Sequence, residues 1–411
     1  MNDERLQKQI LSNPDQLLGA YTASNGEIVV GNKNYKYVDS QPAYSSVAFG
    51  SSYVNMVVDS NGSGEWLHDS RLVVKISAMT KTGGTYCRGV NSLALFMFDG
   101  FRLFSDSKEK AYVTSDMVFE NIYKNVDSDK WARIAADIGY DTTVGNRNTL
   151  GASSQMFAIP LKYMFNMFSK PIDIENLKKI EIRCYLKANI AFCLQTDGTA
   201  PIFTFNAFYL DNEYITADPK ITNFSRALAI SNQSPLSFDY EYLDKPIQIA
   251  SGATTVDIPL TELVGKNVID ICFQIRANTS INTVLTSDYT DSNIAITTWN
   301  LKNGNKFITN LQQDVTVVPD YVRVILARLH FIGIKQILGR TNPAITCSFA
   351  HDYSTSDTER SQKYNGYRDF TGIATPNLHL TFPALAAASQ CNVFVRMVKL
   401  VAFNSGSLEN L

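Results

Sequence analysis

The sequence predicts an all-β fold, and three observations support that prediction. After about residue 20, apolar and polar residues alternate with a period of two, as in strands that bury one face. Tyr and Phe, which favour strands, number 20 and 23 among the 411 residues. Helical patterns are confined to residues 105–170 and to the first 20 residues. Because strands and helices do not alternate along the chain, a parallel, doubly wound sheet is not expected.

The strand pattern is clearest where three or more apolar residues share one face. Leu72, Val74 and Ile76 alternate with Val73, Lys75 and other residues of the segment 71–78. Similar alternation occurs at 180–187, 268–276 and 378–382, and further strands are predicted at 53–58, 93–98, 202–209, 321–332 and 392–403. Such half-buried strands are typical of antiparallel sheets that cover a core on one side.

Helical signals cluster in the first half of the chain. Three helices are predicted there, each after a residue that suits a helix start: 116–125 after Ser115, 129–138 after Ser128, and 161–168 after Pro160. Long polar segments at 80–92, 139–154, 277–312 and 350–377 are predicted to be loops. The helices therefore form one insertion among strands.

A polar, turn-rich stretch at residues 211–235 divides the chain into two halves of similar length. Each half has room for about eight strands, the number in a jelly roll built from two Greek keys. We expect an N-terminal helical arm at 1–20, a first jelly roll at 21–217 and a second at 218–411. The predicted architecture is two jelly-roll β-barrels in tandem, with a short helical insertion in the first.

Composition narrows the classes of function. The formal net charge is −2, and charged residues make up 18% of the chain, so no basic footprint of nucleic-acid binding is present. A nearly neutral surface does not repel copies of itself, which allows dense self-association. We expect no signal peptide and no membrane-spanning helix. Six cysteines without a C-x-x-C pair are expected to be buried thiols.

Residues with catalytic or metal-binding potential are few. The histidines lack the spacing that places two imidazoles on one zinc ion. They are His68, His330, His351 and His379. His351 precedes Asp352, but no nucleophile elbow accompanies the pair. Glycine-rich segments near residues 62–64 and 83–84 lack phosphate-binding spacing and are interpreted as hairpin turns.

Carboxylates are also scattered singly. Glu181 and Asp270 fall on the polar faces of predicted strands, where a solvated or interface role is expected. Asp288 and Asp291 are too few for a calcium loop. The sequence therefore predicts no enzyme, with no catalytic residue, cofactor-binding residue or metal ligand.

The order of segments resembles that of a known family. Residues 157–161 read Phe-Ala-Ile-Pro-Leu, an aromatic turn follows at 163–168, and residues 177–179 lead into the alternating strand 180–187. Near the end, a loop at 364–370, a short strand at 376–382 and a final strand at 393–403 follow one another. Together these segments resemble the double jelly-roll major capsid proteins, a family that includes adenovirus hexon and capsid proteins of tailless membrane-containing phages, virophages and large DNA viruses.

The resemblance implies a structural protein of a virion. Three copies would form a trimer of six barrels, a pseudo-hexagonal tile of an icosahedral capsid. The partners would be further copies of the chain, with penton or minor capsid proteins and an internal membrane reached by the N-terminal arm as further candidates. Direct nucleic-acid binding is not expected, because the arm carries three acidic and two basic residues.

Three alternatives stay open on the sequence. A carbohydrate-binding or adhesin-like β-sandwich would use an exposed aromatic platform, for which Trp66, Trp131 and Trp299 are the candidates. An enzyme on a β-sandwich would need a carboxylate pair that the sequence does not identify. A capsid subunit with a single barrel would favour a basic arm, which this chain lacks.

Overall fold

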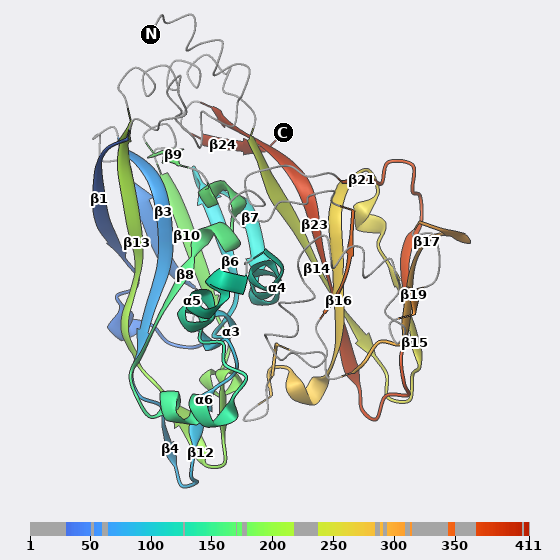
Figure 1. The fold of residues 1–411 in the computed structure, drawn as a ribbon, viewed down its shortest axis with the longest axis horizontal. Helices are drawn as coiled ribbons and strands as arrows, with labels where there is room; N and C mark the ends of the chain where they lie inside the picture. Colours follow the sequence, from blue (N-terminus) through green and yellow to red (C-terminus); the bar gives the residue numbers. More distant parts are fainter. Residues whose placement is uncertain are drawn as a thin grey trace, which may run out of the picture.

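The computed structural model describes residues 30–50, 53–59, 65–125, 128–169, 171–174, 179–217, 237–283, 288–290, 294–308, 313–314, 344–349, 367–404 and 407–410. The described strands form two β-sandwiches that lie side by side (Figure 1). The predicted arm at residues 1–20, the predicted strand at 321–332 and most of the loop at 350–377 lie outside these ranges. All strand pairs in the two sandwiches are antiparallel, as the alternating pattern predicts.

Eight strands build the first sandwich. They are β1 (Val30–Asp39), β2 (Val54–Asp59), β3 (Glu65–Ile76), β6 (Phe98–Ser105), β7 (Lys108–Thr114), β8 (Gln155–Pro160), β10 (Lys179–Leu186) and β13 (Phe205–Ala217). One sheet has the order β1-β13-β3-β8 and the other β2-β10-β6-β7. Counted along the chain, these orders are 1-8-3-6 and 2-7-4-5, so first and last strands are neighbours, as in a jelly roll.

Eight strands of the second half repeat this order. They are β14 (Ser237–Ile249), β15 (Thr255–Pro259), β16 (Asn267–Ala277), β17 (Thr298–Asn303), β18 (Lys306–Phe307), β20 (Ile345–Ser348), β22 (Pro376–Thr381) and β23 (Ser389–Asn404). The sheets are β14-β23-β16-β20 and β15-β22-β17-β18, which again gives 1-8-3-6 and 2-7-4-5. Among the described strands, none of the first half pairs with one of the second. The chain therefore holds two jelly rolls of one topology.

Short strands extend these sheets or form two small two-stranded sheets. They are β4 (Thr80–Thr82), β5 (Cys87–Gly89), β9 (Ile172–Asp173), β11 (Leu194–Thr196), β12 (Thr199–Ile202), β19 (Gln313–Asp314), β21 (Arg368–Asp369) and β24 (Ser407–Asn410). The hairpin predicted at residues 83–84 does not form, because β4 pairs with β12 and β5 with β11, and the prediction at 62–64 lies outside the described residues. The turn still needs glycine, because Gly83 and Gly84 have positive φ and a Cβ on Gly84 would clash with Asp197.

The helical insertion lies between β5 and β8. It comprises α3 (Leu93–Phe96), α4 (Ser115–Asn125), α5 (Ser128–Ile138) and α6 (Val144–Gly151). The helices predicted at 116–125 and 129–138 are confirmed, and each begins one residue earlier, at Ser115 and Ser128. The first turn of α4 is capped by Thr114, whose Oγ1 accepts a hydrogen bond from Met117 N at 3.4 Å. Short 3-10 turns complete the elements: η1 (Tyr44–Ser46), η2 (Leu161–Tyr163), η3 (Asn166–Ser169), η4 (Ile190–Cys193), η5 (Thr261–Leu263) and η6 (Asn278–Ser280).

Five element predictions are corrected. The predicted strand 93–98 is mostly α3, because a short, fully apolar run does not distinguish a buried helix from a strand. The predicted helix 161–168 is replaced by η2 and η3. The loop predicted at 139–154 contains α6, and the one at 277–312 contains β17. The predicted strand 202–209 is divided, since β12 ends at its first residue and β13 begins at Phe205.

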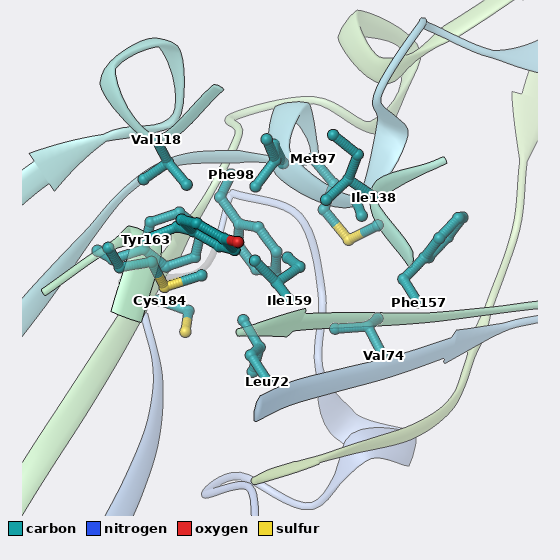
Figure 2. Packing of buried hydrophobic residues seen from close by; sticks show 14 of the residues in the cluster. Leu72, Val74, Met97, Phe98, Val118, Ile138, Phe157, Ile159, Tyr163 and Cys184 are labelled. Carbon is teal, nitrogen blue, oxygen red and sulfur yellow. The ribbon is translucent and has the colours of Figure 1, made fainter. Parts of the chain in front are cut away.

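The core of the first jelly roll joins both sheets to the helices. Figure 2 shows Leu72 and Val74 of β3 beside Ile159 of β8, with Val118 of α4 and Ile138 of α5 above them. A separate core fills the second jelly roll, between its own two sheets. All six cysteines are buried and free, as the sequence predicts. Helices α3, α4 and α5 thus form part of the first core, and α4 also faces the second jelly roll (Figure 1).

Candidate functional site

The histidines do not gather into a reactive centre. The Nδ1 atom of His68 lies 2.9 Å from Glu213 Oε1, and that of His379 lies 2.9 Å from Asp257 Oδ1. These pairs are on the surfaces of different jelly rolls. His330 and His351 lie outside the described residues. In the part of the chain that the structure describes, no three His, Cys, Asp or Glu side chains could share a metal ion.

The two strand carboxylates are held in ion pairs. Glu181 accepts a hydrogen bond from Arg183 Nε at 2.5 Å, and Asp270 accepts one from Arg396 Nη2 at 2.7 Å. They lie on β10 and β16, in different jelly rolls, so they do not form a catalytic pair. Asp288 accepts hydrogen bonds from Thr290, while Asp291 is outside the described residues.

The tryptophans do not provide a sugar platform. Trp66, Trp131 and Trp299 are all buried, and the Phe273 ring packs edge-on against Trp299 at 5.5 Å. Because a platform must expose its aromatic face, the role predicted for these three residues in the carbohydrate-binding alternative is wrong. Their burial is the ordinary role of large aromatic side chains in a core.

The candidate functional surface is the outer face of one sheet. The two jelly rolls have matching sheets, and only one of these has its outer face buried. Strand β16 is the third strand of the second jelly roll and is buried on both faces. Ile271, Phe273 and Ile275 point into its own core. The alternate residues Cys272 and Gln274 are each 1% exposed, although they point out of the sandwich. A neighbouring structure must therefore cover the outer face of this sheet.

That cover is the first jelly roll. Arg276 of β16 donates a hydrogen bond from Nη1 to Asp116 Oδ1 of α4 at 2.7 Å, and Arg276 is 2% exposed. Asn121 of the same helix donates to the Tyr242 hydroxyl of β14 at 3.0 Å. Cys272 belongs to the first core cluster. The outer face of the second sheet thus completes the core of its neighbour.

A second set of contacts joins the same two jelly rolls. Tyr289 stacks on Phe96 of α3 with ring centroids 4.9 Å apart, and its hydroxyl donates to Phe192 O at 3.2 Å. Lys187 Nζ, at the end of β10, donates to Asn282 Oδ1 at 2.9 Å and to Asp99 Oδ1 at 3.0 Å. The contact between the jelly rolls is therefore wide, and both apolar and polar groups contribute to it.

The matching sheet of the first jelly roll has an outer face that no other element within the described ranges covers. Tyr35 and Tyr37 of β1 are 59% and 67% exposed. Beside them, Glu213 of β13 accepts hydrogen bonds from Lys33, Tyr35 and His68. Burial alone would raise the pKa of Glu213, but these hydrogen bonds outweigh it and hold that pKa below its ordinary value. The face carries fixed polar groups between large aromatic side chains.

Comparison with known proteins identifies the fold. No family model matches the sequence, and no curated protein does. VP54 of PBCV-1, from a crystal structure fitted into a reconstruction of the virophage Sputnik, is similar in structure with a TM-score of 0.64 at 12% identity. The alignment covers 92% of this chain and 96% of VP54. The chain has the double jelly-roll fold of viral major capsid proteins.

Two further double jelly rolls support that identification. The Faustovirus major capsid protein aligns with a TM-score of 0.63 at 9% identity, over 92% of each chain. The mavirus major capsid protein aligns with a TM-score of 0.50 at 8% identity, over 95% of this chain and 93% of that one. At such identities the likeness concerns the fold. Within the described residues, no helix of this double jelly roll is long and apolar enough to cross a membrane.

Sequence reasoning missed the residues that distinguish the two outer faces of this double jelly roll. Tyr35 and Tyr37 carry the period-two signal of a strand, but that signal does not say which face stays uncovered. Arg276 resembles a solvated residue at the end of a strand and is buried by a helix 160 positions earlier. The exposure of Tyr35 and Tyr37 and the burial of Arg276 become evident only when the packing of the two jelly rolls is known.

Proposed function

We propose that this chain is a major capsid protein, which forms pseudo-hexagonal trimers that tile an icosahedral virus shell. The observation that carries the proposal is the uncovered outer face of β1-β13-β3, whose counterpart on β14-β23-β16 is buried against a jelly roll. Because the two jelly rolls share one topology, we expect the outer face of β1-β13-β3 to be covered by a jelly roll, as the outer face of β14-β23-β16 is. In the proposed trimer, the first jelly roll of one copy covers its sheet with the second jelly roll of the next.

This contact is head-to-tail, because two different surfaces meet. A head-to-tail contact generates a ring when its rotation closes. Three chains supply six jelly rolls, which alternate around the ring and give it a pseudo-hexagonal outline. The net charge of −2 supports the proposal, since copies of a nearly neutral chain can pack without strong repulsion.

Further parts of the proposal concern the N-terminal segment and the division of the chain. We assign residues 1–20 to an arm that contacts neighbouring trimers, minor capsid or penton proteins, or an internal membrane. Residues 21–217 and 218–411 are assigned to the two jelly rolls, and β13 ends at Ala217. In this role the chain is a building block of the virion, and it needs no catalytic residue and no cofactor.

The solution mass tests the proposal. We expect a particle of three times the 45.8 kDa chain mass by analytical ultracentrifugation or mass photometry. The double variant Tyr35→Ser and Tyr37→Ser should shift the particle towards the monomer, because both rings would be buried at the contact. The single chain should lose less than about 1 kcal/mol of stability, because both rings are more than half exposed.

A matched control is Tyr367→Ser, since Tyr367 is also an exposed tyrosine, at 42%, but lies on the second jelly roll before β21. This variant should remain trimeric if the β1 face is the contact. A monomeric wild-type chain at micromolar concentration would contradict the trimer. A wild-type trimer that survives both tyrosine changes would place the contact on another face.

A further inference from the structure

We propose that the contact between the two jelly rolls is a proton-sensitive joint, which closes when Asp244 is protonated and loosens when Asp244 ionises. The joint lies within one chain, so it operates whether or not the chain assembles. It consists of the outer face of β14-β23-β16 and the elements of the first jelly roll that cover it.

The position of Asp244 supplies the first step. Asp244 lies on β14, where it pairs with Phe394 of β23, which in turn pairs with Cys272 of β16. Residues paired in this way point to the same side of a sheet. Because Phe394 and Cys272 pack into the first core cluster, Asp244 points towards the first jelly roll as well. Its carboxyl therefore lies between the two jelly rolls.

The carboxyl of Asp244 lacks compensation there. Its Oδ1 atom is shielded from solvent and has no hydrogen-bond partner among the described residues. The cation that acts on it is Arg276, which is already engaged by Asp116 Oδ1 at 2.7 Å and by the Tyr289 carbonyl. Ionisation would place negative charge on the shielded Oδ1 atom, which has no hydrogen bond to stabilise it, and this is costly.

Charged groups on the elements that pack against Asp244 affect its ionisation. From α4 come the carboxylates of Asp116 and Glu120, and η3 contributes no ionisable side chain. The strands of the joint also carry Lys110 and Tyr112 of β7, Arg276 and Asp270 of β16, and Arg396 and Lys399 of β23. Lys187 and Asp99 belong to the second set of contacts, where they are paired with each other. Asp270 is paired with Arg396, and Lys399 donates to the Lys110 carbonyl. The groups that act on Asp244 are therefore mainly Asp116, which opposes its charge, and Arg276, which favours it.

The pKa of Asp244 agrees with this geometry. Burial, followed by the neighbouring charge of Asp116, raises the pKa of Asp244 from 3.8 to about 7, although Arg276 acts in the opposite direction. A carboxyl whose pKa is higher in the closed joint than in the open one favours closure while it is protonated. Closure is therefore fully stabilised below pH 3.8 and weakens as the pH rises through about 7.

Cysteine labelling can follow this joint. Cys272 lies on the joint face, whereas Cys184 lies in the first core and Cys391 in the second. Labelling with iodoacetamide, read peptide by peptide by mass spectrometry, separates opening of the joint from unfolding of either jelly roll. Rates are corrected with a model thiol, because the reactivity of a thiol itself rises with pH.

We expect the opening equilibrium reported by Cys272 to rise about 30-fold between pH 5.5 and 8.5 in the wild-type chain, as the two pKa values require. The Asp244→Asn variant should show little change over the same range and should label more slowly than wild type at pH 8.5. The control Asp257→Asn removes an exposed carboxyl of the second jelly roll and should behave as wild type.

Two outcomes would overturn the proposal. One is a Cys272 opening equilibrium that is equally flat in wild type and Asp244→Asn. The other is labelling of Cys272 in step with Cys391 at every pH, because this would mean that the second jelly roll unfolds instead of separating. The solution mass of each variant is recorded in parallel, so that any loss of assembly is distinguished from opening of the joint.

Discussion

The two jelly rolls share one strand order, yet matching sheets lie in different surroundings. In the first, the outer face of β1-β13-β3 exposes Tyr35 and Tyr37. In the second, the outer face of β14-β23-β16 buries Cys272, Gln274 and Arg276 against the helical insertion of the first. The topology of a jelly roll therefore determines which strands are neighbours. Whether the outer face of a sheet is buried depends on what packs against it.

The helices account for much of this difference. The first jelly roll carries α3 to α6, and Val118 of α4 and Ile138 of α5 belong to its core. In the described part of the second jelly roll, the helical elements are the 3-10 turns η5 and η6. One face of α4 packs on its own sandwich, while Asp116 and Asn121 reach the neighbouring one. The insertion thus couples the two jelly rolls.

The largest effect is expected from a cavity in the second core. Phe273 is fully buried and packs edge-on against Trp299. Phe273→Ala should lower the free energy of unfolding by about 4 kcal/mol, because it removes apolar contacts and leaves a cavity. Chemical denaturation with labelling of Cys391 and Cys184 measures whether both jelly rolls are affected.

This experiment also tests how closely the jelly rolls are coupled. If the joint makes them one cooperative unit, Cys184 of the first core should become accessible at the same lowered denaturant concentration as Cys391. The exposed Phe307 provides a control, and Phe307→Ala should change stability by less than about 0.5 kcal/mol. Accessibility of Cys391 alone would mean that the two jelly rolls unfold separately.

A smaller loss is expected when the buried ion pair of the joint is broken. Arg276→Met leaves Asp116 without its cation and should cost about 3 kcal/mol. Adding Asp116→Leu should recover most of that loss, because the joint would then hold two apolar groups in place of a lone charge. Thermal unfolding of the two single variants and the double variant measures the coupling.

An exposed pair on the same jelly roll is the matched control. Lys266 and Glu241 are 3.0 Å apart, but both side chains are more than 40% exposed. Lys266→Met should therefore cost less than about 1 kcal/mol. Equal losses at the two sites would contradict the conclusion that the first jelly roll shields Arg276 from water.

The sequence predicts the elements whose signal is local. Alternation over 180–187 corresponds to β10, and α4 and α5 begin at Ser115 and Ser128, each one residue before its predicted start. The prediction failed at 93–98, because residues buried on all sides show no period. The local sequence pattern therefore predicts the secondary structure of a segment when one of its faces is exposed to solvent and the other is buried.

The candidate surfaces depend on contacts that no local pattern encodes. Asp116 and Arg276 are 160 residues apart, and each has the sequence signature of a solvated residue. The polar face of β16 was interpreted as solvated or as an interface, and only the position of α4 decides in favour of an interface. Conversely, the alternative of a sugar platform fails because all three tryptophans are buried, and the strand pattern around Trp66 and Trp299 does not show which face is covered.

The smallest effect concerns a carboxylate on the uncovered face, and its pH response should oppose that of Asp244. Glu213 accepts hydrogen bonds from Lys33, Tyr35 and His68, and its pKa is lowered. Its contribution to stability is therefore present above the ordinary glutamate pKa and is lost as the pH falls through the lowered value.

Glu213→Gln should cost less than about 1 kcal/mol at pH 7, because the cations around Glu213 are largely exposed and water screens them. The difference from wild type should shrink in acid, whereas the difference between Asp244→Asn and wild type should grow in alkali. Melting temperatures of both variants from pH 3 to 9 measure the two trends. Parallel trends would mean that the covered and uncovered faces present their carboxylates to the same environment, which would remove the electrostatic basis for distinguishing them.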